Sequence, residues 1–355
     1  MDTKSKQLTD AQGAASVSER AQAPIPEGED RDTLLNYYHQ MVLIRRFEEK
    51  AGEMYTKARI GGYCHLNLGE EATVVGFCQG LEPTDYVYTN YREHGYAIGR
   101  GISPEAVMAE LFGKETGCSH GRGGSMHLFD INKHFMGGYG IVGGQIPLAT
   151  GAAFAVAYRD SHEVVACQMG DGTTNGGPFY ESLNLAKIYH LPIIYFVVNN
   201  GYGMGLRVEQ GSAVSELYRK ACAFDMSSER VDGTDVLAVR DAMRRAAKLA
   251  REQHEPSLLE AASFRFRGHS VVDPDRYRDP KEVKAGRTQE DPITAFAARL
   301  QAAGLIDDQG LQKMEEQVEQ EVEHAVQFAE QSPDPPVEGL FDYMYAPAET
   351  SQGGK

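Results

Sequence analysis

The chain has 355 residues, 41% of them hydrophobic, and its 35 basic and 51 acidic side chains give a formal net charge of −16. This length accommodates one large domain or two small ones with a sizeable buried core. Its apolar runs, such as residues 191–198, are far shorter than the roughly 20 residues of a membrane span, and the acidic balance argues against nucleic acid as a partner.

The cysteines and the N-terminus indicate the cellular compartment. The five cysteines are far apart and form no Cys-x-x-Cys pair, which is typical of a reducing cytosol. Residues 1–30 contain three basic and six acidic side chains, the opposite of an Arg-rich transit peptide, and no apolar signal-like stretch. We therefore expect a cytoplasmic protein of bacterial type, without a signal or transit peptide.

Composition divides the chain into four parts. Residues 1–31 are rich in Ala, Gln, Ser and Pro and have few large apolar side chains, so we expect a flexible tail. An α/β domain is expected over residues 32–290, a helical extension over 291–347, and a second flexible tail over 348–355. The α/β domain opens with an amphipathic helix at 34–54, where apolar residues recur at helical spacing.

The middle of the chain begins with a helix start and a long glycine-rich region. Ser103, Pro104 and Glu105 form an N-cap, a first-turn proline and an acidic first turn. Residues 113–151 are rich in glycine and almost without periodicity, and long loops of this kind are commonly functional. An alternating pattern typical of βαβ units comes next, with a helix at 149–158, a strand at 164–169, a helix at 179–189 and a strand at 193–198.

The last third of the chain is expected to be mostly helical. Thr234 is positioned to cap one helix, and residues 258–264 are typical of a buried strand. Residues 266–287 are dense in Asp, Arg and Pro and predict a polar loop. A final helix with a glutamate-rich outer face ends before Pro333.

Polar residues follow both predicted central strands. The first strand ends in Gly170-Asp171-Gly172 and the second in Asn199-Asn200, with 26 residues between Gly172 and Asn199 for one crossover. Both strand ends therefore reach the same edge of a parallel sheet, where ligands bind in open α/β proteins. Carboxylate and amide oxygens suit Mg²⁺ or Ca²⁺, and a helix N-terminus after Gly172 suits a phosphate. The alternative is a tight turn and an Asx turn without a ligand.

Two other patterns have weaker interpretations. Residues 138–143 spell G-x-G-x-x-G, but no strand is expected over 132–137 and Pro147 interrupts the segment after the pattern, so we do not expect a Rossmann dinucleotide site. The glycine-rich region also contains three histidines at intervals of seven, His120, His127 and His134. They have no helical register and no nearby cysteine, so we interpret them as ordinary loop residues rather than metal ligands.

Several segments together resemble a known family, the thiamine-diphosphate-dependent 2-oxo acid dehydrogenases. The resemblance extends over about residues 32–347 and is closest to the α-subunits of the decarboxylating component of pyruvate dehydrogenase complexes. The segments are Gly170-Asp171-Gly172 with Asn199-Asn200, Tyr91-Arg92-Glu93-His94-Gly95, Gly121-Arg122-Gly123-Gly124-Ser125-Met126-His127, Gly140-Ile141-Val142-Gly143 and Arg267-Gly268-His269-Ser270.

This resemblance implies a fold and a set of site residues. The fold is a thiamine-diphosphate-binding α/β fold, with a central, mostly parallel sheet flanked by helices and with helical N- and C-terminal extensions. Asp171, Asn200 and the carbonyl of Tyr202 are implied as Mg²⁺ ligands. The remaining implied contacts are Tyr91, Arg92, Gly172 and Thr173 at the diphosphate, Gly140 and Val142 at the aminopyrimidine ring, and His65, His94 and His269 as candidate catalytic residues near the oxo-acid substrate.

The resemblance also implies an activity and partners. The activity is oxidative decarboxylation of pyruvate with reductive acetylation of lipoyl groups on an acyltransferase core. Since the chain has room for the diphosphate half of the site only, a separate β-subunit is expected in an α₂β₂ heterotetramer. A branched-chain 2-oxo acid or acetoin dehydrogenase α-subunit is the alternative substrate class, and a non-catalytic scaffold or an NAD-dependent oxidoreductase is the alternative of another kind.

The chain departs from the family pattern at two places. Residues 172–178 read Gly-Thr-Thr-Asn-Gly-Gly-Pro where members commonly have Ala-Ala-Asn-Gln-Gly, which leaves the implied metal ligands intact. Ser270 is present, but a second serine that is often phosphorylated in mitochondrial members is replaced by Asp275-Arg276-Tyr277. We therefore do not expect control by a kinase.

Overall fold

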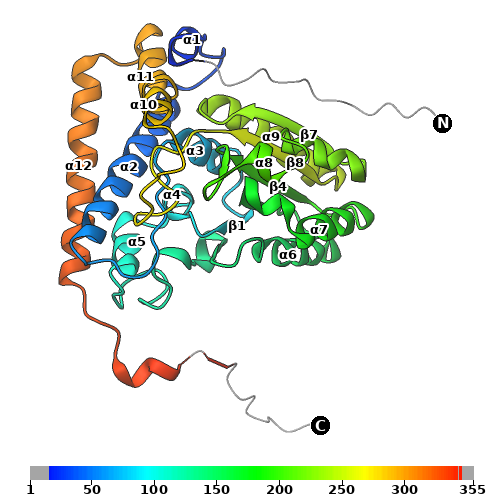
Figure 1. Cartoon of the computed structure of the whole chain (residues 1–355), viewed down its shortest axis with the longest axis horizontal. Helices are drawn as coiled ribbons and strands as arrows, with labels where there is room; N and C mark the ends of the chain where they lie inside the picture. Colours follow the sequence, from blue (N-terminus) through cyan, green and yellow to red (C-terminus); the bar gives the residue numbers. More distant parts are fainter. Residues whose placement is uncertain (1–15, 343, 346–355) are drawn as a thin grey trace.

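The computed structural model describes residues 16–342, 344 and 345 (Figure 1). Within them, six parallel strands form one sheet in the order β2-β1-β3-β4-β8-β7. The predicted α/β fold with a parallel sheet is confirmed. The strands are β1 (Tyr86–Asn90), β2 (Phe135–Tyr139), β3 (Val165–Gly170), β4 (Ile193–Asn199), β7 (Ser227–Asp232) and β8 (Ser257–Ala262).

Helices cover both faces of the sheet, so successive residues of the central strands enter two separate cores. On β4, Ile194 and Phe196 pack with α2, α3 and α9, whereas Ile193 and Tyr195 pack with α6 and α7. Because both faces are buried, β4 is a continuous apolar run rather than an alternating one. These helices are α2 (Arg31–Thr56), α3 (Glu71–Gln79), α6 (Gln145–Arg159), α7 (Gly177–Ile188) and α9 (Val236–Gln253).

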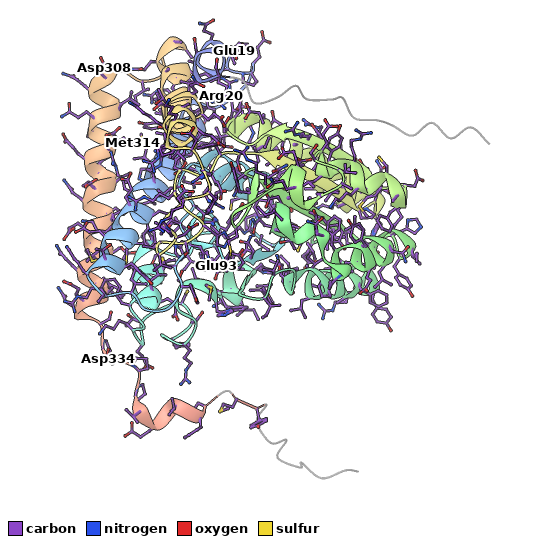
Figure 2. The ribbon with its side chains drawn as sticks, viewed as in Figure 1. Glu19, Arg20, Glu93, Asp308, Met314 and Asp334 are labelled. Carbon is purple, nitrogen blue, oxygen red and sulfur yellow. The ribbon has the colours of Figure 1, made fainter. Side chains whose placement is uncertain are left out.

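The C-terminal helices extend the core on the side of α2. The long α12 (Asp308–Gln331) packs on α2 and on α5 (Pro104–Leu111), and its buried residues belong to the same core as α2 and α3. Figure 2 shows α12 along one side of the molecule, with Asp308 and Met314 in its first half and Asp334 beyond its end. The segment 291–347 thus shares a hydrophobic core with the α/β domain, as far as it is described.

The remaining elements are short. Among the described residues, no helix has the length and apolar character needed to cross a bilayer. These elements are α1 (Val17–Gln22), α4 (His94–Gly99), α8 (Val208–Gly211), α10 (Pro280–Gln289), α11 (Pro292–Ala302), the hairpin strands β5 (Tyr202–Gly203) and β6 (Leu206–Arg207), and the 3₁₀ helices η1 (Gly124–Met126), η2 (Ile131–Lys133), η3 (Asp171–Asn175), η4 (Leu217–Phe224) and η5 (Val337–Phe341).

The expectation of a flexible tail over residues 1–31 is wrong for α1. Ser16 and Glu19 form a reciprocal capping box at its start. Arg20 is buried and donates to the Gln289 carbonyl at 3.1 Å and to the Asp232 carboxylate at 3.4 Å. The helix also packs on α11 and α10, so the scarcity of apolar residues was a misleading signal. Residues 1–15 and the predicted tail 348–355 lie outside the described part.

The region around the G-x-G-x-x-G pattern also differs from the prediction. Residues 135–139 form β2, and α6 begins at Gln145 with Pro147 in its first turn. Proline is tolerated there because a first-turn N–H has no intrahelical acceptor. The expectations that residues 132–137 contain no strand and that Pro147 interrupts the segment after the pattern were therefore wrong. β2 is an edge strand, so the pattern lies at the border of the sheet and not at its centre.

Two further boundaries were misplaced. Asp235, not Thr234, caps α9 by accepting from the backbone N–H groups of Leu237 and Ala238. The predicted polar loop 266–287 contains α10, which starts with Asp279 as N-cap and Pro280 in its first turn. This is the same type of signal as Ser103-Pro104, but the density of charges obscured it.

Candidate functional site

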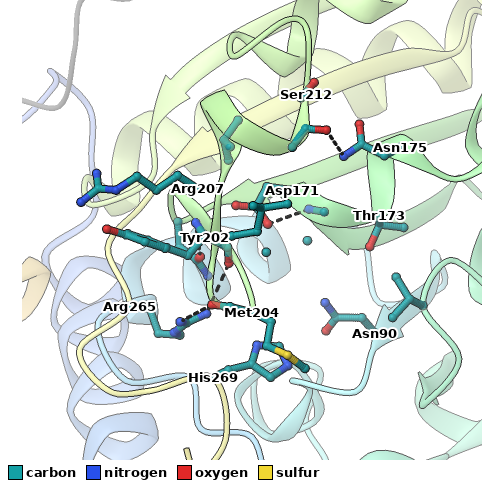
Figure 3. A pocket seen from close by; sticks show the side chains of 18 of the residues that line it. Asn90, Asp171, Thr173, Asn175, Tyr202, Met204, Arg207, Ser212, Arg265 and His269 are labelled. Atoms are coloured by element: carbon teal, nitrogen blue, oxygen red, sulfur yellow. Dashed lines mark hydrogen bonds between the residues drawn. The ribbon is translucent and has the colours of Figure 1, made fainter. Parts of the chain in front are cut away.

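A cavity of about 330 Å³ opens at the carboxyl ends of the central strands (Figure 3). The chain passes from β1 outward to β2 on one side and from β3 to β4 on the other, so the strand order reverses between β1 and β3. Ligands of open α/β sheets bind at this kind of switch point. Asn90 at the end of β1, Asp171 after β3 and Asn200 after β4 all line the cavity. The predicted meeting of the two strand ends at one edge is confirmed.

Asp171 supplies a buried carboxylate with one free oxygen. Oδ1 accepts from the Gly172 N–H at 2.7 Å, whereas Oδ2 is buried and has no hydrogen-bond partner among the described residues. Burial raises the pKa of Asp171 to about 6. A buried acceptor without a donor is costly, and a divalent cation would satisfy it.

Two more oxygens predicted as metal ligands lie at the same cavity. Asn200 donates from Nδ2 to Oε1 of Glu70 at 2.8 Å, and the Tyr202 carbonyl accepts from Nη1 of Arg265 at 3.4 Å. The described residues contain no group of three or more His, Cys, Asp or Glu able to hold a metal. A cation here would therefore use one carboxylate, an amide and a carbonyl oxygen, with further ligands from phosphate and water.

The side of the cavity assigned to a diphosphate is basic and allows close backbone approach. Arg92 is buried and donates to the carbonyls of Leu66 at 2.6 Å and His269 at 2.7 Å. Gly172 lines the cavity without a side chain, which leaves its backbone open to a ligand; an added Cβ would make an ordinary contact, 3.4 Å from Cα of Gly203. Thr173 also lines the cavity, on the 3₁₀ turn that precedes α7.

Arg265 is a second buried cation at the cavity, and the sequence analysis missed it. Its guanidinium donates to Tyr277 Oη at 2.8 Å and to the Met204 carbonyl at 3.3 Å. Burial lowers its pKa, and the nearby Arg92 adds to this effect. Its position three residues beyond the end of β8, at the same sheet edge, was the signal that could have identified it.

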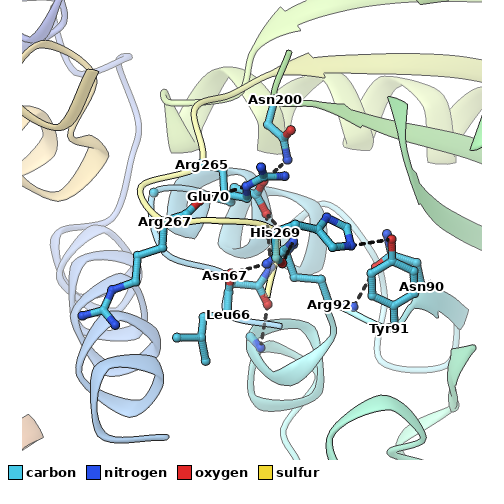
Figure 4. Close-up of polar contacts among 12 residues, drawn as sticks. Leu66, Asn67, Glu70, Asn90, Tyr91, Arg92, Asn200, Arg265, Arg267 and His269 are labelled. Atoms are coloured by element: carbon cyan, nitrogen blue, oxygen red, sulfur yellow. Dashed lines mark hydrogen bonds and ion pairs between the residues drawn. The ribbon is translucent and has the colours of Figure 1, made fainter. Parts of the chain in front are cut away.

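His65, Tyr91 and His269 form an aromatic cluster near Arg92. Tyr91 and His269 line the cavity and are shown in Figure 4, whereas His65 packs behind them and is not one of the lining residues. The His65 ring centroid lies 4.4 Å from that of Tyr91 and 5.0 Å from that of His269. Burial, reinforced by Arg92, lowers the pKa of His65 to about 2 and that of His269 to about 4. Both imidazoles are therefore neutral near pH 7, and the described residues offer no partner to either Nδ1.

His94 lies elsewhere, contrary to the expectation that it would be near the reacting centre. It is fully buried, with Nδ1 2.9 Å from Glu48 Oε2 and Nε2 2.8 Å from Ser125 Oγ. Both ring nitrogens are occupied inside the fold, and His94 does not line the cavity as described. Its environment is that of a structural histidine.

The two residues assigned to the aminopyrimidine ring are placed differently from each other. Val142 lines the cavity and is exposed, as is its neighbour Ile141. Gly140 does not line the cavity in the described part of the chain, and its nearest side-chain neighbour is His127. An exposed apolar rim at the mouth is consistent with a second surface closing over it.

Comparison with known proteins identifies relatives over most of the chain. The family described as dehydrogenase E1 component matches residues 39–338, a range that includes every residue lining the cavity. The pyruvate dehydrogenase E1 component subunit alpha of Rhizobium meliloti (strain 1021) is 42% identical over 338 residues, covering 92% of this chain and 97% of that protein. The proteins of the same name from Zymomonas mobilis and Porphyra purpurea are 43% and 42% identical, with 88% of this chain covered in each case and 88% and 93% of those proteins.

Proposed function

The chain belongs to the dehydrogenase E1 component family, and from this premise we propose that it is the alpha subunit of a pyruvate dehydrogenase E1 component. As such it is an oxidoreductase of a multienzyme complex that decarboxylates pyruvate oxidatively and acetylates lipoyl groups reductively. The observation that carries this proposal is the family match across residues 39–338, together with several relatives of that name at about 40% identity.

The cavity fits thiamine diphosphate with Mg²⁺. The free oxygen of Asp171 suits the cation, with Asn200 and the Tyr202 carbonyl as further ligands. The cofactor, when bound, supplies the nucleophilic carbon and the electron sink that decarboxylation of a 2-oxo acid requires. The diphosphate would lie between the backbone at 172–173 and the buried charges of Arg92 and Arg265, since guanidinium groups match phosphate oxygens.

The aromatic cluster has the properties of a substrate-binding wall. Neutral imidazoles at His65 and His269 can donate hydrogen bonds to the carboxylate of a small oxo acid, and one can hold a proton at a fixed atom. The 3.4 Å contact between Tyr91 Oη and His269 Nε2 orients that ring. His65 is buried, whereas Tyr91 and His269 are half-buried and line the cavity, where a substrate can reach them.

The partners are inferred from the incomplete site and from its surroundings. An exposed apolar surface extends from the cavity mouth along α6 and α7, and surfaces of this kind mark protein interfaces. We propose that the β-subunit covers this surface in an α₂β₂ heterotetramer. The heterotetramer also contacts the lipoyl-bearing acyltransferase core. The residues of this surface are Ile141, Val142, Leu148, Phe154, Tyr158, Leu185, Ile188 and Tyr189.

The organisation of the chain completes the proposal. Residues 32–290 would bind the diphosphate and Mg²⁺, while residues 291–347 would act as a helical extension that braces α2. A cytoplasmic location of bacterial type accords with the reducing environment that the cysteines indicate. Those in the described part of the chain are all free thiols.

The test is release of CO₂ from pyruvate with thiamine diphosphate, Mg²⁺ and an artificial electron acceptor. The chain would be assayed alone and co-expressed with a β-subunit, with 2-oxoisovalerate as the competing substrate and acetoin followed by acceptor reduction. We expect activity only with the β-subunit and chiefly on pyruvate. Cofactor binding with turnover of another substrate would overturn the assignment to pyruvate. Absence of cofactor binding would overturn the proposal that the chain is part of a thiamine-dependent enzyme.

A further inference from the structure

Glu70 is a buried carboxylate that no motif marks in the sequence; it lies behind Asn200 and does not line the cavity itself. It immediately precedes α3, and only 2% of its surface is exposed. One of its oxygens, Oε1, accepts from Nδ2 of Asn200 at 2.8 Å. Figure 4 shows the two side chains pointing toward each other from opposite sides of the site.

This contact determines which way the Asn200 amide faces. An amide has an NH₂ group that only donates and a carbonyl oxygen that only accepts, whereas a carboxylate accepts. The nitrogen of Asn200 must therefore face Glu70, and Oδ1 is turned away from it. On that side Oδ1 accepts from the backbone N–H of Tyr202 at 3.4 Å.

Glu70 is itself held by a buried polar network. Asn67 donates from Nδ2 to Glu70 Oε2 at 3.4 Å. The backbone N–H of Asn67 donates to Glu48 Oε1 at 3.0 Å. Glu48 is in turn paired with His94 at 2.9 Å. The carboxylate is thus anchored to α2 and α4, so it holds Asn200 from a rigid part of the fold.

The second oxygen of Glu70 also faces the diphosphate side. Oε2 lies 4.0 Å from Nε of Arg92. One carboxylate therefore connects the amide that would ligate the cation with the guanidinium that would face the phosphate. The two halves of the site are separated by more than 100 residues in sequence, and Glu70 joins them.

On the basis of the proposed function, we propose that Glu70 is a positioning residue for the cation site. It fixes the Asn200 amide so that Oδ1 faces the cation, and it couples this ligand to Arg92. Partners of metal ligands typically change metal affinity by roughly 10–100-fold when they are removed. A purely structural role of Glu70 would instead change stability without a selective effect on the cation.

The experiment uses the assembled α₂β₂ protein and Mn²⁺, whose binding is followed by electron paramagnetic resonance in the presence of thiamine diphosphate. Glu70→Ala is expected to weaken Mn²⁺ binding by roughly 10–100-fold. Glu70→Gln keeps an oxygen that can accept from Asn200, so it is expected to restore most of the affinity. If Glu70→Ala does not assemble, Glu70→Met, which fills the space without an acceptor, provides the same comparison.

A double-mutant cycle tests whether Glu70 acts through Asn200. Asn200→Ser keeps an oxygen ligand but removes the NH₂ group, so Glu70→Ala should have little further effect on Mn²⁺ affinity in that background. Glu71→Gln is the matched control, since Glu71 is also buried but pairs with Arg45 at 2.6 Å. This control should change thermal stability and leave Mn²⁺ affinity unchanged.

Three outcomes would overturn the inference. Mn²⁺ affinity of Glu70→Ala equal to that of the unchanged protein would remove Glu70 from the site. A full loss that persists in the Asn200→Ser background would show that Glu70 does not act through Asn200. Failure of the unchanged protein to bind Mn²⁺ with thiamine diphosphate would overturn the proposed function, and this inference with it.

Discussion

The hydroxyl of Tyr91 lies 3.4 Å from Nε2 of His269, although 178 residues separate them in sequence. Tyr91 follows β1 directly, and His269 lies on the loop after β8. The ring of His65 packs against both. Strand order in the parallel sheet therefore assembles a cluster of polar aromatic side chains next to the cavity, and its chemistry can be tested residue by residue.

Replacing His269 should separate chemistry from cofactor binding. Because its imidazole contacts Tyr91 and not the proposed cation ligands, His269→Gln should lower turnover by about 10²–10⁴-fold, a range typical of losing a positioned proton donor. The affinity for thiamine diphosphate should stay close to that of the unchanged protein. Tyr91→Phe keeps the ring and removes only the hydroxyl, so its effect should be smaller. Equal turnover of His269→Gln and the unchanged enzyme would exclude His269 from the reaction.

Asp171→Asn should abolish Mg²⁺-dependent cofactor binding without lowering the stability of the protein. The buried carboxylate has one oxygen without a donor, and neutralising it removes a desolvation cost of roughly 1–3 kcal/mol. The cofactor-free variant should therefore have a Tm equal to or above that of the unchanged protein. Calorimetric titration should at the same time detect no Mg²⁺-dependent cofactor binding. Retained binding in this variant would contradict the assignment of Asp171 as a metal ligand.

His94→Ala should damage the fold rather than the chemistry. Removal of the imidazole leaves the buried Oε2 of Glu48 without its hydrogen-bond partner, and an unsatisfied buried acceptor costs about 1–3 kcal/mol in addition to the lost packing. We expect a fall in the urea midpoint, with little change in the specific activity of the remaining folded enzyme at saturating Mg²⁺ and thiamine diphosphate. Ser125→Ala removes only the hydroxyl partner and should cost about 1 kcal/mol. A His94→Ala enzyme that is folded but inactive would contradict the structural role and support a catalytic role for His94.

The pH dependence of stability should report the neutral imidazoles. His65 and His269 have pKa values lowered to about 2 and about 4, so below pH 6.5 the unfolded chain binds protons that the folded chain does not. The contribution of the two histidines to stability should therefore be constant above pH 6.5 and fall between pH 6.5 and 4, by about 1.4 kcal/mol per pH unit for each histidine. The raised pKa of Asp171 acts in the opposite direction below about pH 6.

The variant His65→Gln isolates this effect, because it lacks one titrating group and keeps the carboxyl groups that also titrate in this range. The Tm of the cofactor-free unchanged protein should decline more steeply with falling pH than that of His65→Gln. Parallel curves from pH 7.5 to pH 4.5 would show that His65 does not resist protonation in the folded state.

Local sequence signals were sufficient to predict the central strands of the sheet and the polar residues at their ends. Apolar runs of six or seven residues between turn signals predicted β3 and β4, and the crossover length placed Asp171 and Asn200 at one edge. Side-chain periodicity and turn chemistry act over a few residues, so they can be recognised without the fold. The same local signals did not predict α1, whose polar sequence does not reveal its packing on α11 or the burial of Arg20.

Only the tertiary structure decided the roles of residues that depend on distant neighbours. His94 and His269 are both histidines in family-like motifs, yet one is fully satisfied inside the core and the other lies at the cavity. Glu70 and Arg265 carried no motif and were identified by the atoms they contact. Burial and hydrogen-bond partners come from segments up to hundreds of residues apart, and they determine whether a polar side chain stabilises the fold or serves the site.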